Sequence, residues 1–73
     1  MQNTFELRGE YIALCDLLKV CGIADSGGAA KHLVSEGVIS VDGQIELRKT
    51  CKIRPGQLVS GEGFSITVVG AHA

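Results

Sequence analysis

The 73-residue sequence has no tryptophan, and its only aromatic residues are Phe5, Tyr11 and Phe64. Aliphatic side chains must therefore supply most of the core, at roughly 25 cal/mol per Å² of apolar surface buried. No apolar run reaches the about 18 residues typical of a membrane-spanning helix, and the first residues lack the basic end and apolar stretch of a signal peptide. We therefore expect a cytoplasmic protein with no membrane partner.

Metal-site and catalytic motifs are also missing. Three cysteines cannot all pair within one chain, and none belongs to a Cys-x-x-Cys motif. His32 and His72 have no second histidine or cysteine at metal spacing, and the acidic residues are scattered. We predict three reduced thiols, with Cys21 in the core, and no metal or other cofactor. A chain this short also offers no deep pocket, which argues against an enzyme.

Positive charge is gathered in one stretch although the net charge is only −1. Residues 1–18 carry −2, whereas residues 44–56, the basic segment, carry +3. Its cations are Arg48, Lys49, Lys52 and Arg54, with Glu46 the only acid nearby. The segment is either a charged sheet edge that discourages aggregation or a surface that attracts a polyanion.

The first half of the chain predicts a strand and two helices. Residues 4–8 alternate as in a half-buried strand, and residues 10–13 fit either a loop or a helix start. Leu14, Leu17, Leu18 and Cys21 follow the one-face spacing of an amphipathic helix, and Gly22 can end it. A second helix should begin after Ser26 and end at Gly37, forming a hairpin with the first.

The second helix begins with Ser26, Gly27 and Gly28, followed by Lys31. The first amides of a helix carry partial positive charge and attract phosphate, and glycine leaves room for close approach. Such a start is a weak signal alone, but it gains weight from the four cations downstream.

The second half predicts short strands. Residues 38–41 and 44–47 should pair across a tight Asp42–Gly43 turn, and residues 54–57 form a turn around Pro55 and Gly56. Strands are expected at residues 58–59 and 64–69. The predicted fold class is α+β: a two-helix hairpin packed on a small, mostly antiparallel sheet. Residues 1–70 form one domain, and residues 71–73 are expected to be a flexible tail.

These motifs resemble the S4-type RNA-binding domain, named for ribosomal small-subunit protein four, over about two-thirds of the chain. The similarity rests on Gly22 to Lys31, on the Gly37-Val38-Ile39 and Val41-Asp42-Gly43 stretches, and on Arg54-Pro55-Gly56. The Ser-Gly-Gly-x-Ala-Lys variant resembles the small stand-alone bacterial branch. The resemblance implies an alpha-L motif that binds structured RNA such as ribosomal or transfer RNA. Many members have Arg where this chain has Gly27, and Asn where it has Asp42.

We therefore expect a monomeric, non-catalytic RNA-binding domain whose basic segment and second-helix start share one face. The candidate contacts are Ser26, Gly27, Gly28, Lys31, Arg48, Lys49, Lys52 and Arg54, with Lys19 and His32 as secondary candidates. The basic segment contains no aromatic residue, which favours folded RNA over stacking on single strands. The alternative is a protein-interaction module of the same fold with little RNA affinity, and a protein partner is compatible with either.

Overall fold

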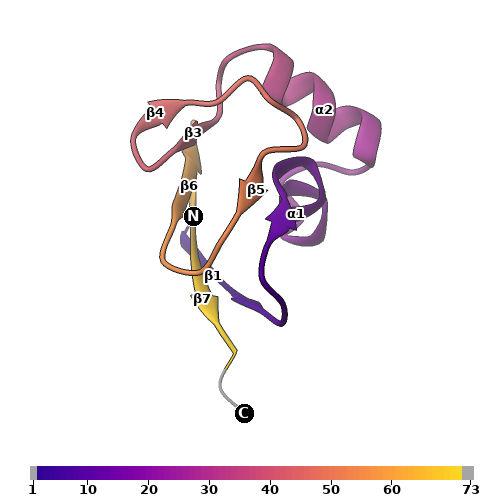
Figure 1. Ribbon diagram of the computed structural model, residues 1–73. Coiled ribbons are helices and arrows are strands. Elements are labelled where there is room, and N and C mark those ends of the chain that lie inside the picture. Colours follow the sequence, from indigo (N-terminus) through magenta and orange to yellow (C-terminus); the bar gives the residue numbers. More distant parts are fainter. Residues whose placement is uncertain (1, 72–73) are drawn as a thin grey trace.

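The computed structural model describes residues 2–71 and contains two helices and seven short strands (Figure 1). In chain order they are β1 (Gln2–Leu7), β2 (Ile12–Ala13), α1 (Leu14–Val20), α2 (Gly27–Ser35), β3 (Ser40–Val41), β4 (Gln44–Ile45), β5 (Lys52–Ile53), β6 (Leu58–Gly61) and β7 (Phe64–Gly70).

Five strands form one sheet in the order β1-β7-β6-β3-β4. Three of its pairings are antiparallel, whereas β1 runs parallel to β7, with Gln2 opposite Ser65 and Leu7 opposite Gly70. The two helices pack together beside the sheets (Figure 1). The expected α+β class, a helix hairpin with a mostly antiparallel sheet, is confirmed. The parallel pair was not predicted, because it joins opposite ends of the sequence.

A second, two-stranded sheet joins β2 to β5, with Ile12 opposite Ile53 and Ala13 opposite Lys52. Residues 10–13 fitted either a loop or a helix start in the sequence, and no strand was predicted at residues 52–53. Two-residue strands carry no periodicity of their own, so only the folded chain reveals the pairing. Ile53 is fully buried, which fixes the inner face of this small sheet.

The core is aliphatic, as the composition requires. Leu14, Leu17 and Leu18 of α1 are completely buried, together with Ala30 and Val34 of α2. The predicted core position of Cys21 holds only in part, since Cys21 is half-buried against the core while Cys15 is 6% exposed. Cys21 follows the last residue of α1 as its C-cap, with its amide donating to the Leu17 carbonyl at 3.0 Å, so it lies at the exposed end of the helical stripe.

The predicted turns are present. Asp42 and Gly43 have φ values of 52° and 85°, the positive values that a tight hairpin turn requires. Gly56 has a φ of 94° in the turn after Pro55. The strands around the first turn are shorter than predicted, although a hydrogen bond from the Glu46 amide to the Ile39 carbonyl (2.9 Å) extends their pairing.

The end of the described chain is attached to the sheet. Gly70 belongs to β7, and the Ala71 amide donates to the Leu7 carbonyl at 3.0 Å. This hydrogen bond involves the first residue of the expected tail, and residues 72–73 lie outside the described residues. The division into a domain of residues 1–70 and a flexible tail stays a prediction. Among residues 2–71, neither helix is long and apolar enough to cross a membrane.

Candidate nucleic-acid interface

Residues 47–52, the basic loop, are fastened to the start of α1. This helix has no side-chain cap. Instead, the Leu14 amide donates to the Cys51 carbonyl (2.9 Å) and the Cys15 amide donates to the Lys49 carbonyl (3.0 Å). The loop backbone therefore satisfies amides that every helix start leaves free. The loop is held in place by this cap while the Lys49 and Lys52 side chains stay exposed.

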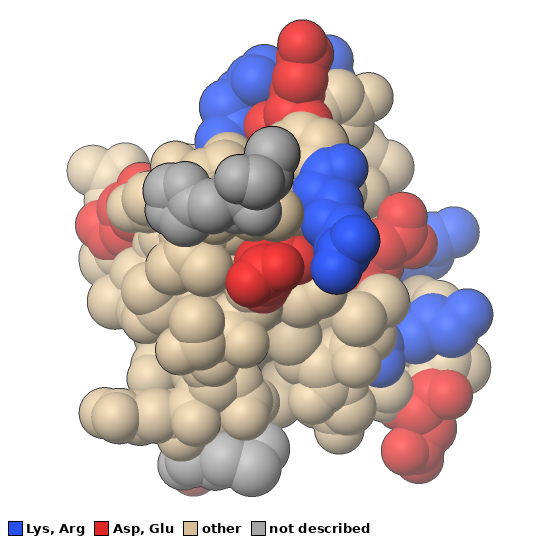
Figure 2. All heavy atoms as spheres, turned by 90° about the horizontal axis from the view of Figure 1, so that it is seen from below, with Lys and Arg blue, Asp and Glu red and all other residues tan. Residues whose placement is uncertain are grey.

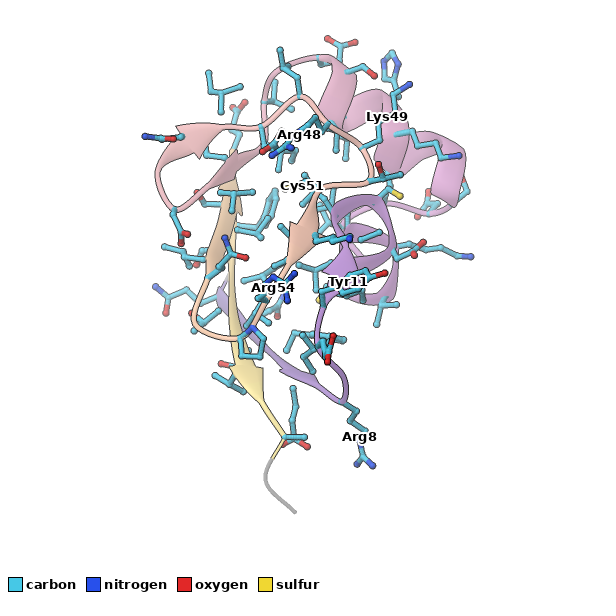
Figure 3. All side chains as sticks on the ribbon, in the orientation of Figure 1. Arg8, Tyr11, Arg48, Lys49, Cys51 and Arg54 are labelled. Carbon is cyan, nitrogen blue, oxygen red and sulfur yellow. The ribbon has the colours of Figure 1, made fainter. Side chains whose placement is uncertain are left out.

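The basic loop surrounds an open hollow of about 660 Å³. It is lined by Leu47, Arg48, Lys49, Thr50, Cys51 and Lys52. Figure 3 shows Arg48 and Cys51 near the middle of this loop and Lys49 at its side next to α2. A hollow rimmed by cations on a fixed backbone is suited to an anionic backbone and too open for a small substrate.

Arg48 is already paired with an acid. Its Nε and Nη2 atoms donate to Glu46 Oε2 and Oε1 at 3.0 and 3.2 Å, and its amide donates to Oε2 at 2.9 Å. These hydrogen bonds from the Arg48 side chain and amide lower the pKa of Glu46 to about 2. Glu46 therefore neutralises one specific cation of the four and leaves Lys49, Lys52 and Arg54 without an ion pair among residues 2–71.

Tyr11 joins the basic segment through the β2–β5 pairing. Lys52 Nζ lies 5.0 Å and Arg54 Cζ 5.8 Å from the centre of its ring, and Figure 3 shows Tyr11 and Arg54 side by side. Tyr11 was not among the predicted RNA contacts, because it is far from the basic segment along the chain. One feature of the sequence could have identified it: Tyr11 is the only tyrosine of the chain and directly precedes the apolar Ile12 and Ala13.

The start of α2 has the predicted cap. Ser26 Oγ accepts a hydrogen bond from the Ala29 amide at 3.1 Å. The Gly27 and Gly28 amides have no hydrogen-bond partner among the described residues, and no atom outside the local chain comes within 4 Å of a Cβ built at Gly27. These two amides remain available to an anion.

The remaining candidates lie on the helix surfaces. Lys19 and Lys31 are exposed, and His32 Nε2 contacts Glu36 Oε1 at 2.7 Å along the same helix. Seen from below, Lys and Arg are interspersed with Asp and Glu, so that face has no continuous positive field (Figure 2). That the α2 start and the basic segment share one face stays a prediction.

The cysteines show no metal site. All three are free thiols, and no three His, Cys, Asp or Glu residues within the described range 2–71 form a group that could hold a metal ion. Burial raises the pKa of the Cys21 and Cys51 thiols, which favours their protonated form. His72 lies outside this range, and the absence of metal stays a prediction.

The helix hairpin, the sheet and the capped α2 start define the class of protein. The chain belongs to the S4 domain family, whose model matches residues 5–69. It is 49% identical over 67 residues to the "Putative RNA-binding protein YbcJ" of Escherichia coli (strain K12), covering 90% of this chain and 96% of that protein.

Two further similarities are informative. The "Probable ribosome maturation protein RlbA" of Bacillus subtilis (strain 168) is 34% identical over 64 residues, covering 88% of this chain and 90% of that protein. The solution structure of YbcJ from E. coli, described as revealing an alfaL motif involved in RNA binding, superposes with a TM-score of 0.71. That match covers 90% of this chain and 85% of the other.

Proposed function

We propose that this protein binds structured RNA through its phosphate backbone and carries out no catalysis. The observation that carries the proposal is the basic loop, whose exposed cations stand on a backbone fixed by its hydrogen bonds to α1. The name of the YbcJ relative supports RNA as the partner. We propose ribosomal RNA before transfer RNA, because one relative is named for ribosome maturation.

Recognition would rest on charge and shape. RNA helices present phosphates and 2′-hydroxyls, while their deep groove hides most base edges. Lys49, Lys52 and Arg54 are the main proposed phosphate contacts, together with Lys31 and the free amides of the α2 start. Arg48, Lys19 and His32 are secondary, since Arg48 and His32 already have acidic partners. We propose that the domain acts as a monomer in the cytoplasm.

The test is a salt titration of RNA affinity. Removing a phosphate contact lowers the slope of log K against log salt by about 0.7–0.9, so Lys49→Ala should bind hairpin RNA more weakly and less steeply. The double variant Lys49→Ala with Lys52→Ala should lower the RNA affinity and the salt slope further, by a similar amount. Unfolding free energy should change by about 0.5 kcal/mol or less, since both side chains are exposed.

The matched control is Arg8→Ala, which removes one exposed positive charge after β1. Arg8 lies at the opposite end of the molecule from Lys49 in Figure 3. If Arg8→Ala and Lys49→Ala lower affinity and slope equally, binding is a general charge effect and the basic loop is not the site. Unchanged affinity in a folded double variant would overturn the proposal.

A protein-interaction role is the second candidate. Val38, Ile45 and Leu47 are 46%, 65% and 60% exposed. Ile45 and Leu47 meet over Gly37, where an added Cβ would lie 4.0 and 3.7 Å from their side chains. An apolar surface directly beside the basic loop fits a protein neighbour next to the RNA. Ile45→Ser with unchanged RNA affinity but lost association with a ribosomal particle would support it.

A further inference from the structure

The face that Tyr11 occupies is fixed by strand register. Ile12 lies opposite Ile53, and Ile53 is fully buried. Side chains alternate across a strand, so Tyr11 and its neighbours Lys52 and Arg54 stand on the outer face of the β2–β5 sheet. Tyr11 is 46% exposed, and both cations lie within the about 6 Å at which a cation–π attraction operates.

This arrangement does not serve the core. Ile12, on the other face, packs against the core while Tyr11 faces solvent. Tyr11 presents a planar ring with few rotatable bonds, and Lys52 Nζ and Arg54 Cζ lie over that ring. Both atoms are at the ends of long, exposed side chains, so a flat group can stack on the ring when these side chains turn to neighbouring phosphates. The cations beside it are suited to the phosphates that accompany a base.

We propose that Tyr11 is a stacking platform for one unpaired base of the bound RNA, with Lys52 and Arg54 contacting the phosphates next to that base. The inference rests on the proposed function and adds the kind of RNA to it. A base inside a helix is already stacked on its neighbours, so the occupant must come from a bulge, a loop or a single-stranded end. The preferred RNA is then a helix with an unpaired nucleotide beside it.

The first experiment uses the protein's own fluorescence. Tyr11 is the only tyrosine and the chain has no tryptophan, so tyrosine emission reports this residue alone. The unmodified protein is titrated with two RNA hairpins whose strands are joined by a non-nucleotide linker, so that neither has unpaired loop bases. One hairpin is blunt and the other has a three-nucleotide single-stranded extension. Free N-acetyltyrosinamide corrects for absorption by the RNA, and anisotropy of labelled hairpins follows binding in parallel.

The expected result is a loss of tyrosine emission with the extended hairpin and a much smaller loss with the blunt one. Anisotropy without any change in emission from either hairpin would overturn the stacking inference and leave the proposed function standing. No anisotropy change with either hairpin would overturn the proposed function, and the stacking inference with it.

The second experiment separates stacking from mere positioning of the two cations. Base–aromatic stacking is worth about 1–3 kcal/mol per base, so Tyr11→Ala should weaken binding of the extended hairpin roughly 5- to 150-fold. The blunt hairpin and both salt slopes should change little, because stacking releases no counterions. Tyr11→Phe keeps the flat ring and should retain the preference.

The opposite pattern is equally measurable. If Tyr11→Ala weakens both hairpins equally and lowers the salt slope, the ring only positions Lys52 and Arg54, and the platform is ruled out. Tyr11→Leu provides an apolar side chain without a flat ring, so it should behave like Tyr11→Ala on the extended hairpin. A thermal melt of each variant confirms that it is folded.

Discussion

The Arg48 guanidinium and the Glu46 carboxylate form an ion pair with two side-chain hydrogen bonds, of 3.0 and 3.2 Å. The charges of Arg48 and Glu46 cancel, so the double variant Glu46→Gln with Arg48→Gln has the same net charge as the unmodified protein. We expect this double variant to change RNA affinity by less than about twofold, whereas Lys49→Ala lowers the salt slope. Anisotropy titrations compare the two, and an equal loss in both would make Arg48 a direct phosphate contact.

The same pair predicts acid sensitivity. The pKa of Glu46 is about 2 in the folded protein, against about 4.3 in an unfolded chain. A lowered folded pKa means that the contribution to stability is present above about pH 4.3 and is lost as the pH falls towards 2. Urea midpoints should therefore decline less steeply between these pH values in Glu46→Gln than in the unmodified protein. Parallel curves would show that the pair does not stabilise the fold.

Asp42 ties the first hairpin to the Pro55 turn. Its carboxylate accepts from the Leu58 amide (2.9 Å) and from Gln57 Nε2 (3.2 Å), while Gln57 Oε1 accepts from the Arg54 amide (2.8 Å). The Leu58 amide, and then the Gln57 side chain, lower the pKa of Asp42. The carboxylate of Asp42 therefore stabilises the fold above the pKa that Asp42 has in the unfolded chain. This stabilisation is lost as the pH falls through the lower pKa of Asp42 in the folded protein.

Asp42→Asn tests this connection. Asparagine tolerates the positive φ of this position. If its side-chain oxygen accepts from the Leu58 amide, its NH2 group faces Gln57 Nε2, and two hydrogen-bond donors then oppose each other. We expect a lower urea midpoint at neutral pH and a smaller difference in acid, where Asp42 protonates. Glu10→Gln, a change in an exposed loop residue, is the control and should leave the midpoint unchanged. A midpoint of Asp42→Asn equal to that of the control would contradict the role of the carboxylate.

Substitution of Gly28 by alanine should change stability and RNA binding in opposite directions. An added Cβ there would meet only Ser26 Oγ, at 3.9 Å, so alanine fits the helix. Gly28→Ala should raise the unfolding free energy by up to about 0.5–1 kcal/mol yet weaken RNA binding, because the methyl group occupies the approach to the free amides. Gly9→Ala, also in open space, is the control. A stabilised Gly28→Ala with unchanged affinity would remove the α2 start from the interface.

The features that could be predicted from sequence are those set by neighbouring residues. The Ser26 cap, the Asp42–Gly43 turn and the helical stripes depend on backbone preferences and spacing over a few positions. The grouping of four cations was also visible, because they lie close together along the chain.

The features that could not be predicted depend on contacts between distant residues. The β2–β5 pairing that brings Tyr11 to Lys52 and Arg54 involves strands of only two residues. The capping of α1 by the Lys49 and Cys51 carbonyls is a backbone interaction, which side-chain identity does not reveal. Which cation Glu46 would neutralise was also open, since all four candidates were within reach along the chain.

The parallel pairing of β1 with β7 has a consequence for synthesis. Within this domain, Gln2–Leu7 is synthesised before the other described strands and pairs in the sheet with Phe64–Gly70, which is synthesised after them. On the ribosome, the edge of β1 therefore has to wait until nearly the whole domain has emerged, and such distant pairings are slow to form. The alternating, partly apolar β1 segment is exposed during that interval, so the nascent chain is most open to chaperones before its final strand leaves the exit tunnel.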